Sequence, residues 1–217
     1  MKKTIIALVV FATICLSMLA IAYAADYKYP DLTWIEQNSR GENVVVAHYA
    51  AREITQATNI GMLDGYPDGT FKPNDSITRA EFTKSLIALA TNRTFDFRNV
   101  YSRYSSWYGP YVTIAEMQGI IDKNKYSDKE LNEPITRIEA ILMLAKTQIN
   151  MKWIPQTQIG TVAYTDIDSL TPDEKALVVH AAQYDLLEGM KDGTETLLDP
   201  DRNLTRGEAA AALMRIY

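Results

Sequence analysis

Three stretches of this chain consist mainly of apolar and helix-forming residues, and each begins with the same polar signature. They span residues 78–90, 136–147 and 205–216, and their apolar positions run nearly all round a helix instead of along one stripe. Helices of this kind are normally buried by other helices. The pattern therefore predicts three helices that share one centre, with apolar positions that include Leu86, Ile87, Leu89, Ile141, Leu142, Leu144, Leu213, Met214 and Ile216.

The signature is Thr-x-x-Glu preceded by an apolar residue, with its threonine at Thr78, Thr136 and Thr205. A threonine at the N-cap and a glutamate three positions later form a capping box, in which each side chain accepts a hydrogen bond from an otherwise unpaired backbone amide. An apolar residue before the N-cap starts a hydrophobic staple. The predicted helices therefore begin at these threonines.

The sequence upstream of each signature repeats as well. A first helix is expected at 45–59, 111–118 and 172–184, followed by a loop and then the capped helix. Such registered repetition predicts three internal copies that bury their apolar surface against one another. We refer to residues 25–94, 95–150 and 151–217 as copies one, two and three. Twelve residues before the loop that begins at Gly61, Gly119 and Asp185, the three copies have Tyr49, Trp107 and Asp173.

An arginine follows each signature threonine, at Arg79, Arg137 and Arg206. A cation in the first turn of a helix faces the positive end of the helix dipole, which is unfavourable. Three arginines at this position suggest that an anion is bound there. One interpretation is a carboxylate or phosphate ligand held by the guanidinium group and the free first-turn amides. The other is an acidic side chain of the adjacent copy, which would lock the copies together.

Residues 61–81 read GMLDGYPDGTFKPNDSITRAE, and this segment closely resembles the S-layer homology domain. Copies two and three fit the same pattern with departures: copy two lacks both loop glycines, and copy three has three inserted residues. The resemblance implies an all-α fold of three tandem helix-loop-helix repeats. These repeats would form a pseudo-threefold arrangement around a central three-helix bundle.

The resemblance also implies that grooves between the repeats bind secondary cell-wall polysaccharides, often pyruvylated. The candidate ligand-binding residues are the motif arginines, two loop residues and one aromatic residue that could stack on a sugar: Arg79, Arg137, Arg206, Gly65, Tyr66 and Trp107. The simplest role for Gly65 and Gly69 is a positive φ in tight turns. Tyr49 and Trp107 could instead anchor the first helices in the core. Because copy one keeps both the full loop and the motif, Arg79 is expected to matter most.

The first 24 residues have the features of a secretory signal peptide. Lys2 and Lys3 precede an apolar run, and Ala22-Tyr23-Ala24 forms a small-x-small cleavage site. An uncleaved anchor is the alternative, because the run is just long enough to span a bilayer. Cys15, the only cysteine, lies in this leader, so the mature chain would contain no disulfide.

The 217-residue chain is acidic. Without the leader it has 20 basic and 27 acidic residues, a net charge of −7, and no basic stripe. A nucleic-acid partner is therefore excluded. The same overall charge repels an anionic wall polymer at long range, so recognition would depend on local arginines and helix N-termini.

Neither catalysis nor metal binding is expected. The glutamates Glu81, Glu139 and Glu208 already have a capping role, and no facing carboxylate pair is indicated. His48 and His180 are isolated and are expected on helix surfaces. Residues 64–75 partly match a calcium-binding loop, but Tyr66 and Pro67 interrupt the oxygen ligands, which favours a structural turn.

The sequence thus predicts a secreted, non-catalytic module without a cofactor that anchors at the cell wall or surface layer. Its expected partner is the secondary cell-wall polysaccharide, with no membrane contact after leader cleavage and with room for a surface protein partner. The alternative is a protein-protein interaction or S-layer lattice component that does not bind glycan directly.

Overall fold

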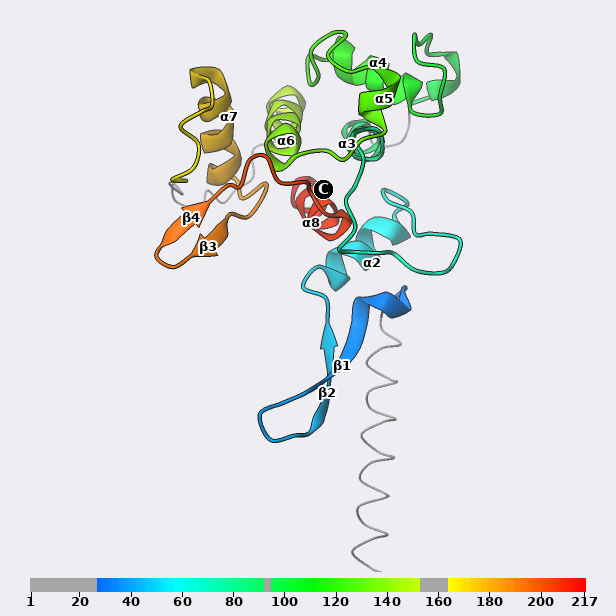
Figure 1. The fold of residues 1–217 in the computed structure, drawn as a ribbon. Coiled ribbons are helices and arrows are strands. Elements are labelled where there is room, and N and C mark those ends of the chain that lie inside the picture. Colours follow the sequence, from blue (N-terminus) through cyan, green and yellow to red (C-terminus); the bar gives the residue numbers. More distant parts are fainter. Residues whose placement is uncertain (1–26, 92–94, 153–163) are drawn as a thin grey trace, which may run out of the picture.

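The computed structural model describes residues 27–91, 95–152 and 164–217 (Figure 1). The predicted leader, residues 1–24, lies outside the described residues. The helices are α2 (Ala51–Asn59), α3 (Arg79–Ala90), α4 (Gly109–Met117), α5 (Asp128–Leu131), α6 (Arg137–Met151), α7 (Pro172–Gln183) and α8 (Arg206–Ile216). Two 3-10 helices, η1 (Pro30–Leu32) and η2 (Phe97–Asn99), and two hairpins, β1 (Thr33–Gln37) with β2 (Asn43–Ala47) and β3 (Met190–Asp192) with β4 (Glu195–Leu197), complete the described chain.

The three capping boxes are present as predicted. The Thr78 hydroxyl accepts from the Glu81 amide at 3.2 Å, and the Glu81 carboxylate accepts from the Thr78 amide at 3.0 Å. The boxes that open α6 and α8 have the same reciprocal bonds. Local sequence alone therefore determines where α3, α6 and α8 begin.

The first helices differ in part from the prediction. In copy one, residues 43–47 form strand β2 and the helix begins at Ala51, not at residue 45. The β-branched run Val44-Val45-Val46 favours a strand, and it pairs with β1 so that Trp34 lies opposite Val46. In copy two, Ser127 and Glu130 form a further capping box that opens the short helix α5. In copy three, the inserted residues build the β3–β4 hairpin.

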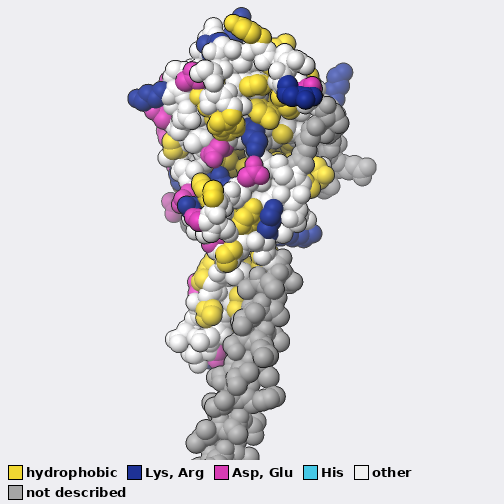
Figure 2. Space-filling view, turned by 90° about the vertical axis from the view of Figure 1, so that its right-hand side faces the viewer, with side chains coloured by type: hydrophobic (Ala, Val, Ile, Leu, Met, Phe, Trp, Pro, Cys, Tyr) yellow, Lys and Arg dark blue, Asp and Glu magenta, His cyan; other side chains and the backbone are white. Residues whose placement is uncertain are grey.

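The β1–β2 hairpin extends from the body of the molecule (Figure 1). It leaves apolar side chains exposed, and Figure 2 shows hydrophobic side chains on the narrow part of the molecule below the body. Both faces of the hairpin contribute: Trp34 is 42% exposed, Ile35 65% and Val44 37%.

The centre of the molecule is a closed ring of backbone hydrogen bonds. The Ile77 amide donates to Leu204 at 3.1 Å, the Leu204 amide to Ile135 at 2.9 Å, and the Ile135 amide to Ile77 at 3.0 Å. These are the apolar residues that precede the three N-caps, and all three are fully buried. Each copy therefore contributes one residue to the ring and bonds to both other copies.

The first helix of each copy packs on the second helix of another copy, in the same cyclic order. Helices α3, α6 and α8 lie side by side in the middle of the molecule (Figure 1). Around them, α4 of copy two packs on α3 of copy one, α7 of copy three packs on α6 of copy two, and α2 of copy one packs on α8 of copy three. The threefold arrangement itself stays a prediction. Among the described residues, no helix is long and apolar enough to cross a membrane.

We expect residues 25–217 to unfold in a single transition, and copy one alone (residues 25–94) to remain unfolded. The reason is that α2 packs on α8 and that Ile77 finds both of its backbone partners in other copies. Thermal unfolding followed by circular dichroism, with amide dispersion in NMR spectra of the isolated copy, provides the measurement. A well-dispersed spectrum from residues 25–94 would contradict this expectation.

Candidate functional site

Each motif arginine forms an ion pair with the motif glutamate of another copy. The Arg79 Nε atom lies 2.9 Å from Glu139, Arg137 Nη1 lies 2.8 Å from Glu208, and Arg206 Nη1 lies 3.6 Å from Glu81. Copy one thus contacts copy two, copy two contacts copy three, and copy three contacts copy one. The anion expected at each first turn is a carboxylate of this chain.

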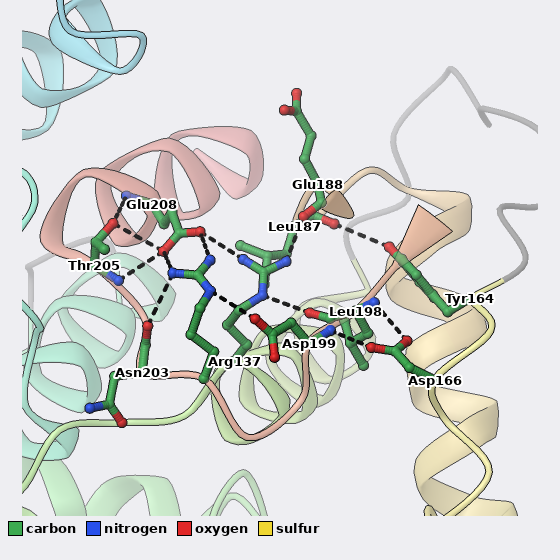
Figure 3. A network of polar contacts seen from close by, with 11 residues as sticks. Arg137, Tyr164, Asp166, Leu187, Glu188, Leu198, Asp199, Asn203, Thr205 and Glu208 are labelled. Carbon is green, nitrogen blue, oxygen red and sulfur yellow. Dashed lines mark hydrogen bonds and ion pairs between the residues drawn. The ribbon is translucent and has the colours of Figure 1, made fainter. Parts of the chain in front are cut away.

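The guanidinium group of Arg137 is fully engaged (Figure 3). Its Nε donates to the Leu198 carbonyl at 2.7 Å, Nη2 to the Glu188 carbonyl at 2.7 Å, and Nη1 to the Glu208 carboxylate. The side chain is only 1% exposed, and burial lowers the pKa of Arg137. Glu208 accepts a second cation, Arg202, on the same oxygen. All three nitrogen atoms of the Arg137 guanidinium therefore have partners within this chain.

Arg206 repeats the same scheme on copy one. Its Nε donates to the Phe71 carbonyl at 3.0 Å and its Nη2 to the Asp64 carbonyl at 2.6 Å. The guanidinium carbon also lies 4.8 Å from the centre of the Tyr66 ring, which covers it. Arg206 therefore holds the loop that contains the sequence GYPDGTF in place.

Arg79 is the most accessible of the three, with 14% of its side chain exposed. Its Nε donates a bifurcated hydrogen bond to the two Glu139 oxygens at 3.0 and 2.9 Å, and Nη1 donates to the Glu130 carbonyl at 3.0 Å. The Tyr126 hydroxyl donates to the same carboxylate at 2.9 Å. The structure thus gives all three arginines a structural partner, while their predicted contact with a ligand stays a prediction.

The positive φ expected at Gly65 is wrong, whereas the one expected at Gly69 is present. The φ of Gly65 is not among the positive values, unlike that of Gly69 at 84°. Gly65 is required for close packing: a Cβ atom there would lie 2.3 Å from the Tyr29 ring, and its amide donates to the Tyr29 hydroxyl at 3.1 Å. The Tyr66 ring is half-buried between the cations of Lys72, at 4.2 Å, and Arg206.

In the described part of the chain, we compare three grooves that lie where helices of different copies meet. The largest, about 720 Å³, lies between α2 and α8, and we call it the α2–α8 groove. The α6–α7 groove has a volume of about 350 Å³ and the α3–α4 groove about 240 Å³. A motif glutamate lines each of them, in the order Glu208, Glu139 and Glu81.

The registered position at or just before the start of each first helix lines a groove. Tyr49 lines the α2–α8 groove, Asp173 the α6–α7 groove and Trp107 the α3–α4 groove. Tyr49 is 68% exposed and Trp107 54%, so these aromatic residues are not core anchors. Trp107 lies with Arg206 and Glu81 in its groove, apart from Arg79 and Arg137.

The two histidines are not the surface residues expected. His48 precedes α2 and is buried; its Nδ1 accepts from the Ala50 amide at 3.2 Å, and its Nε2 lies 3.3 Å from Asn74. Burial lowers the pKa of His48. His180 is partly buried and bonds to Gln148 at 2.8 Å. Within the described residues, no group of His, Cys, Asp or Glu side chains is arranged to hold a metal ion.

Residues 45–83 match the S-layer homology domain family. This chain carries an S-layer homology domain. The match runs from β2 through α2 and the GYPDGTF loop to the motif that opens α3. It therefore includes Gly65, Tyr66 and Arg79 of the candidate site.

Relatives align over much of the chain. The S-layer protein EA1 of Bacillus anthracis is 25% identical over 215 residues, which cover 96% of this chain and 22% of that protein. The amylopullulanase of Thermoanaerobacterium thermosulfurigenes is 25% identical over 173 residues, 79% of this chain and 9% of that protein. The cellulosome-anchoring protein of Acetivibrio thermocellus is 41% identical over 61 residues, 25% of this chain and 14% of that protein.

The chain thus spans less than a quarter of the length of each of these three relatives. The domain and its relatives indicate a location at the cell surface or cell wall. The structure adds that the signature arginine and glutamate form contacts between copies.

Replacing Arg137 by methionine should lower the free energy of unfolding by about 3 kcal/mol, because removing one partner of a buried ion pair leaves the other uncompensated. Glu208 would retain Arg202, which keeps the loss at the low end of the usual range. Denaturant unfolding of both proteins gives the difference. As a control, Arg52→Met removes an exposed arginine and should change stability by no more than about 0.5 kcal/mol. Equal stabilities of the two variants would contradict a structural role for Arg137.

Acid should weaken the fold through the same pairs. Burial acts to raise the pKa of Glu139 and Glu208, but hydrogen bonds from Arg79 and Arg202 hold both values below the usual 4.5. A depressed folded-state pKa gives stability above the unfolded value that is lost as pH falls through the folded value. Unfolding free energy should therefore fall as pH drops below about 4.5, and Glu208→Gln should flatten that dependence. An unchanged pH slope in this variant would show that the pair does not contribute.

Proposed function

We propose that this chain is a non-catalytic module that anchors to the cell wall by binding an anionic, pyruvylated secondary polysaccharide in grooves between its copies. The observation that carries the proposal is that exposed aromatic residues and cations share these grooves. Tyr49 lies with Arg52 in the α2–α8 groove, and Trp107 lies with Lys84 in the α3–α4 groove. Aromatic faces and cations together suit an acidic sugar.

The three copies would supply these grooves through a threefold arrangement. Support comes from the cyclic order of the backbone ring, of the helix packing between copies and of the arginine–glutamate pairs. Of the three motif arginines, Arg79 has the largest exposed fraction, so it remains the one proposed to reach ligand.

Anchoring explains the relatives better than catalysis does. One relative is named as an enzyme, the amylopullulanase, and another as a surface-layer protein, EA1. Each aligns with most of this chain. What they share with it therefore supports a common attachment role. The motif glutamates are held by arginines and by N-cap amides, which leaves them unsuited to acid–base chemistry.

A protein-protein or lattice role is the second candidate. Its specific support is the β1–β2 hairpin, whose exposed Trp34, Ile35 and Val44 could pair with another protein. Both candidates place the chain at the cell surface, and they differ in what the chain contacts there.

Purified cell wall discriminates between them. We expect the chain to sediment with intact wall and to stay in solution when the wall has been stripped of its secondary polymer. Retained binding to stripped wall would favour the protein-interaction role. Circular dichroism before and after incubation controls for unfolding of the unbound protein.

A further inference from the structure

Arg137 and Arg206 are largely occupied by this chain, so an anionic ligand in the grooves also meets other cations. Arg137 and Arg206 expose 1% and 4% of their side chains. Each groove also has a peripheral cation, and the three grooves differ sharply in how free that cation is. This difference shows which groove suits an anion.

The α6–α7 groove is acidic. Its lining carries two lysines, Lys125 and Lys146, against four carboxylates, Asp122, Glu139, Asp173 and Glu174. Like charges would repel an approaching anion. The α3–α4 groove is the smallest, and its peripheral cation, Lys84, is paired with Asp64 at 3.0 Å.

The α2–α8 groove combines the largest volume with two accessible arginines. Arg52 lies on the exposed face of α2 and forms no ion pair with any of the described residues. Arg215, near the end of α8, is 25% exposed. Tyr49 borders the same groove with most of its ring exposed.

Arg215 already pairs with carboxylates of this chain, the chemical group that an acidic sugar would present. Its Nη2 lies 2.5 Å from Glu188 Oε1, and its Nε lies 3.7 Å from Asp185. The Glu188 side chain is 72% exposed, so this ion pair lies at the open edge of the groove. Glu188 holds Arg137 only through its backbone carbonyl. The Glu188 carboxylate can therefore leave Arg215 without disturbing the arginine–glutamate pairs between the copies.

We propose that the α2–α8 groove binds a carboxylate of an acidic saccharide through Arg52 and Arg215. Tyr49 lies against the sugar face, and the Glu188 carboxylate occupies Arg215 until the ligand displaces it. This inference rests on the proposed function and assigns it to one groove and to two arginines outside the repeated motif. It follows that Glu188 competes with the ligand.

The test measures the binding of four variants of the full chain to purified wall. Arg52→Gln and Arg215→Gln should each weaken binding about tenfold, the loss typical of a charge-assisted hydrogen bond. Glu188→Gln should strengthen binding by about two- to fivefold, the size of an exposed ion pair that no longer competes. Arg98→Gln, which removes an exposed, ion-paired arginine outside the three grooves, should bind as wild type does.

The opposite signs at Glu188 and Arg215 separate ligand binding from a structural role. If their ion pair were only structural, both variants would lose stability and neither would bind more tightly. Wild-type binding by Arg52→Gln and Arg215→Gln, or weaker binding by Glu188→Gln, would overturn the inference and leave wall anchoring intact. Failure of the wild type to bind wall would remove the proposed function itself.

Wall whose carboxylates have been converted to neutral amides tests the ligand chemistry. We expect the wild type to lose binding to this wall. Retained binding would show that the groove takes a different anion, or none, and would overturn the assignment of a carboxylate.

Discussion

The arginine–glutamate pairs between copies are the constraint on which the rest of this structure depends. In the signature, each glutamate caps its own helix and receives the arginine of another copy. An arginine in a first turn is unfavourable for an isolated helix. Here a carboxylate at the adjacent N-terminus offsets that cost, and the backbone ring closes beside it. Helix capping and assembly of the copies thus share the same atoms.

The same pairs shape the grooves. Arg137 binds the carbonyl of Glu188 and Arg206 binds that of Asp64, so each arginine fixes a residue that lines a groove. A buried and fully bonded polar network has few alternative arrangements. The backbone of the groove walls at Glu188 and Asp64 is therefore held by the same network as the centre of the molecule. Preformed walls of this kind reduce the ordering cost of binding a flexible polymer.

The sequence reveals local features well and distant ones poorly. The N-caps at Thr78, Thr136 and Thr205 were predictable because a capping box is complete within four residues. The partner of Arg137 was not, since Glu208 lies 71 positions away and several acidic residues were equally plausible. At residues 45–47 the sequence predicts a helix where the structure has strand β2, because a short apolar run fits both periods. The registration of Tyr49 and Trp107 between copies is a sequence signal that coincides with the grooves, since each residue lines one of them.

The buried arginine–glutamate pairs between copies differ from the exposed ion pairs at the groove edges. This difference explains how one scaffold can hold grooves of different chemistry. At the edge of the grooves, Lys84 pairs with Asp64, Lys146 with Asp122, and Arg215 with Asp185 and Glu188. Exposed pairs of this kind contribute little to stability, so they can change without unfolding the protein. The motif pairs cannot, because breaking a buried pair is costly. Under the proposed function, ligand preference can therefore diverge between grooves at exposed positions such as these, while the signature itself is tied to the fold.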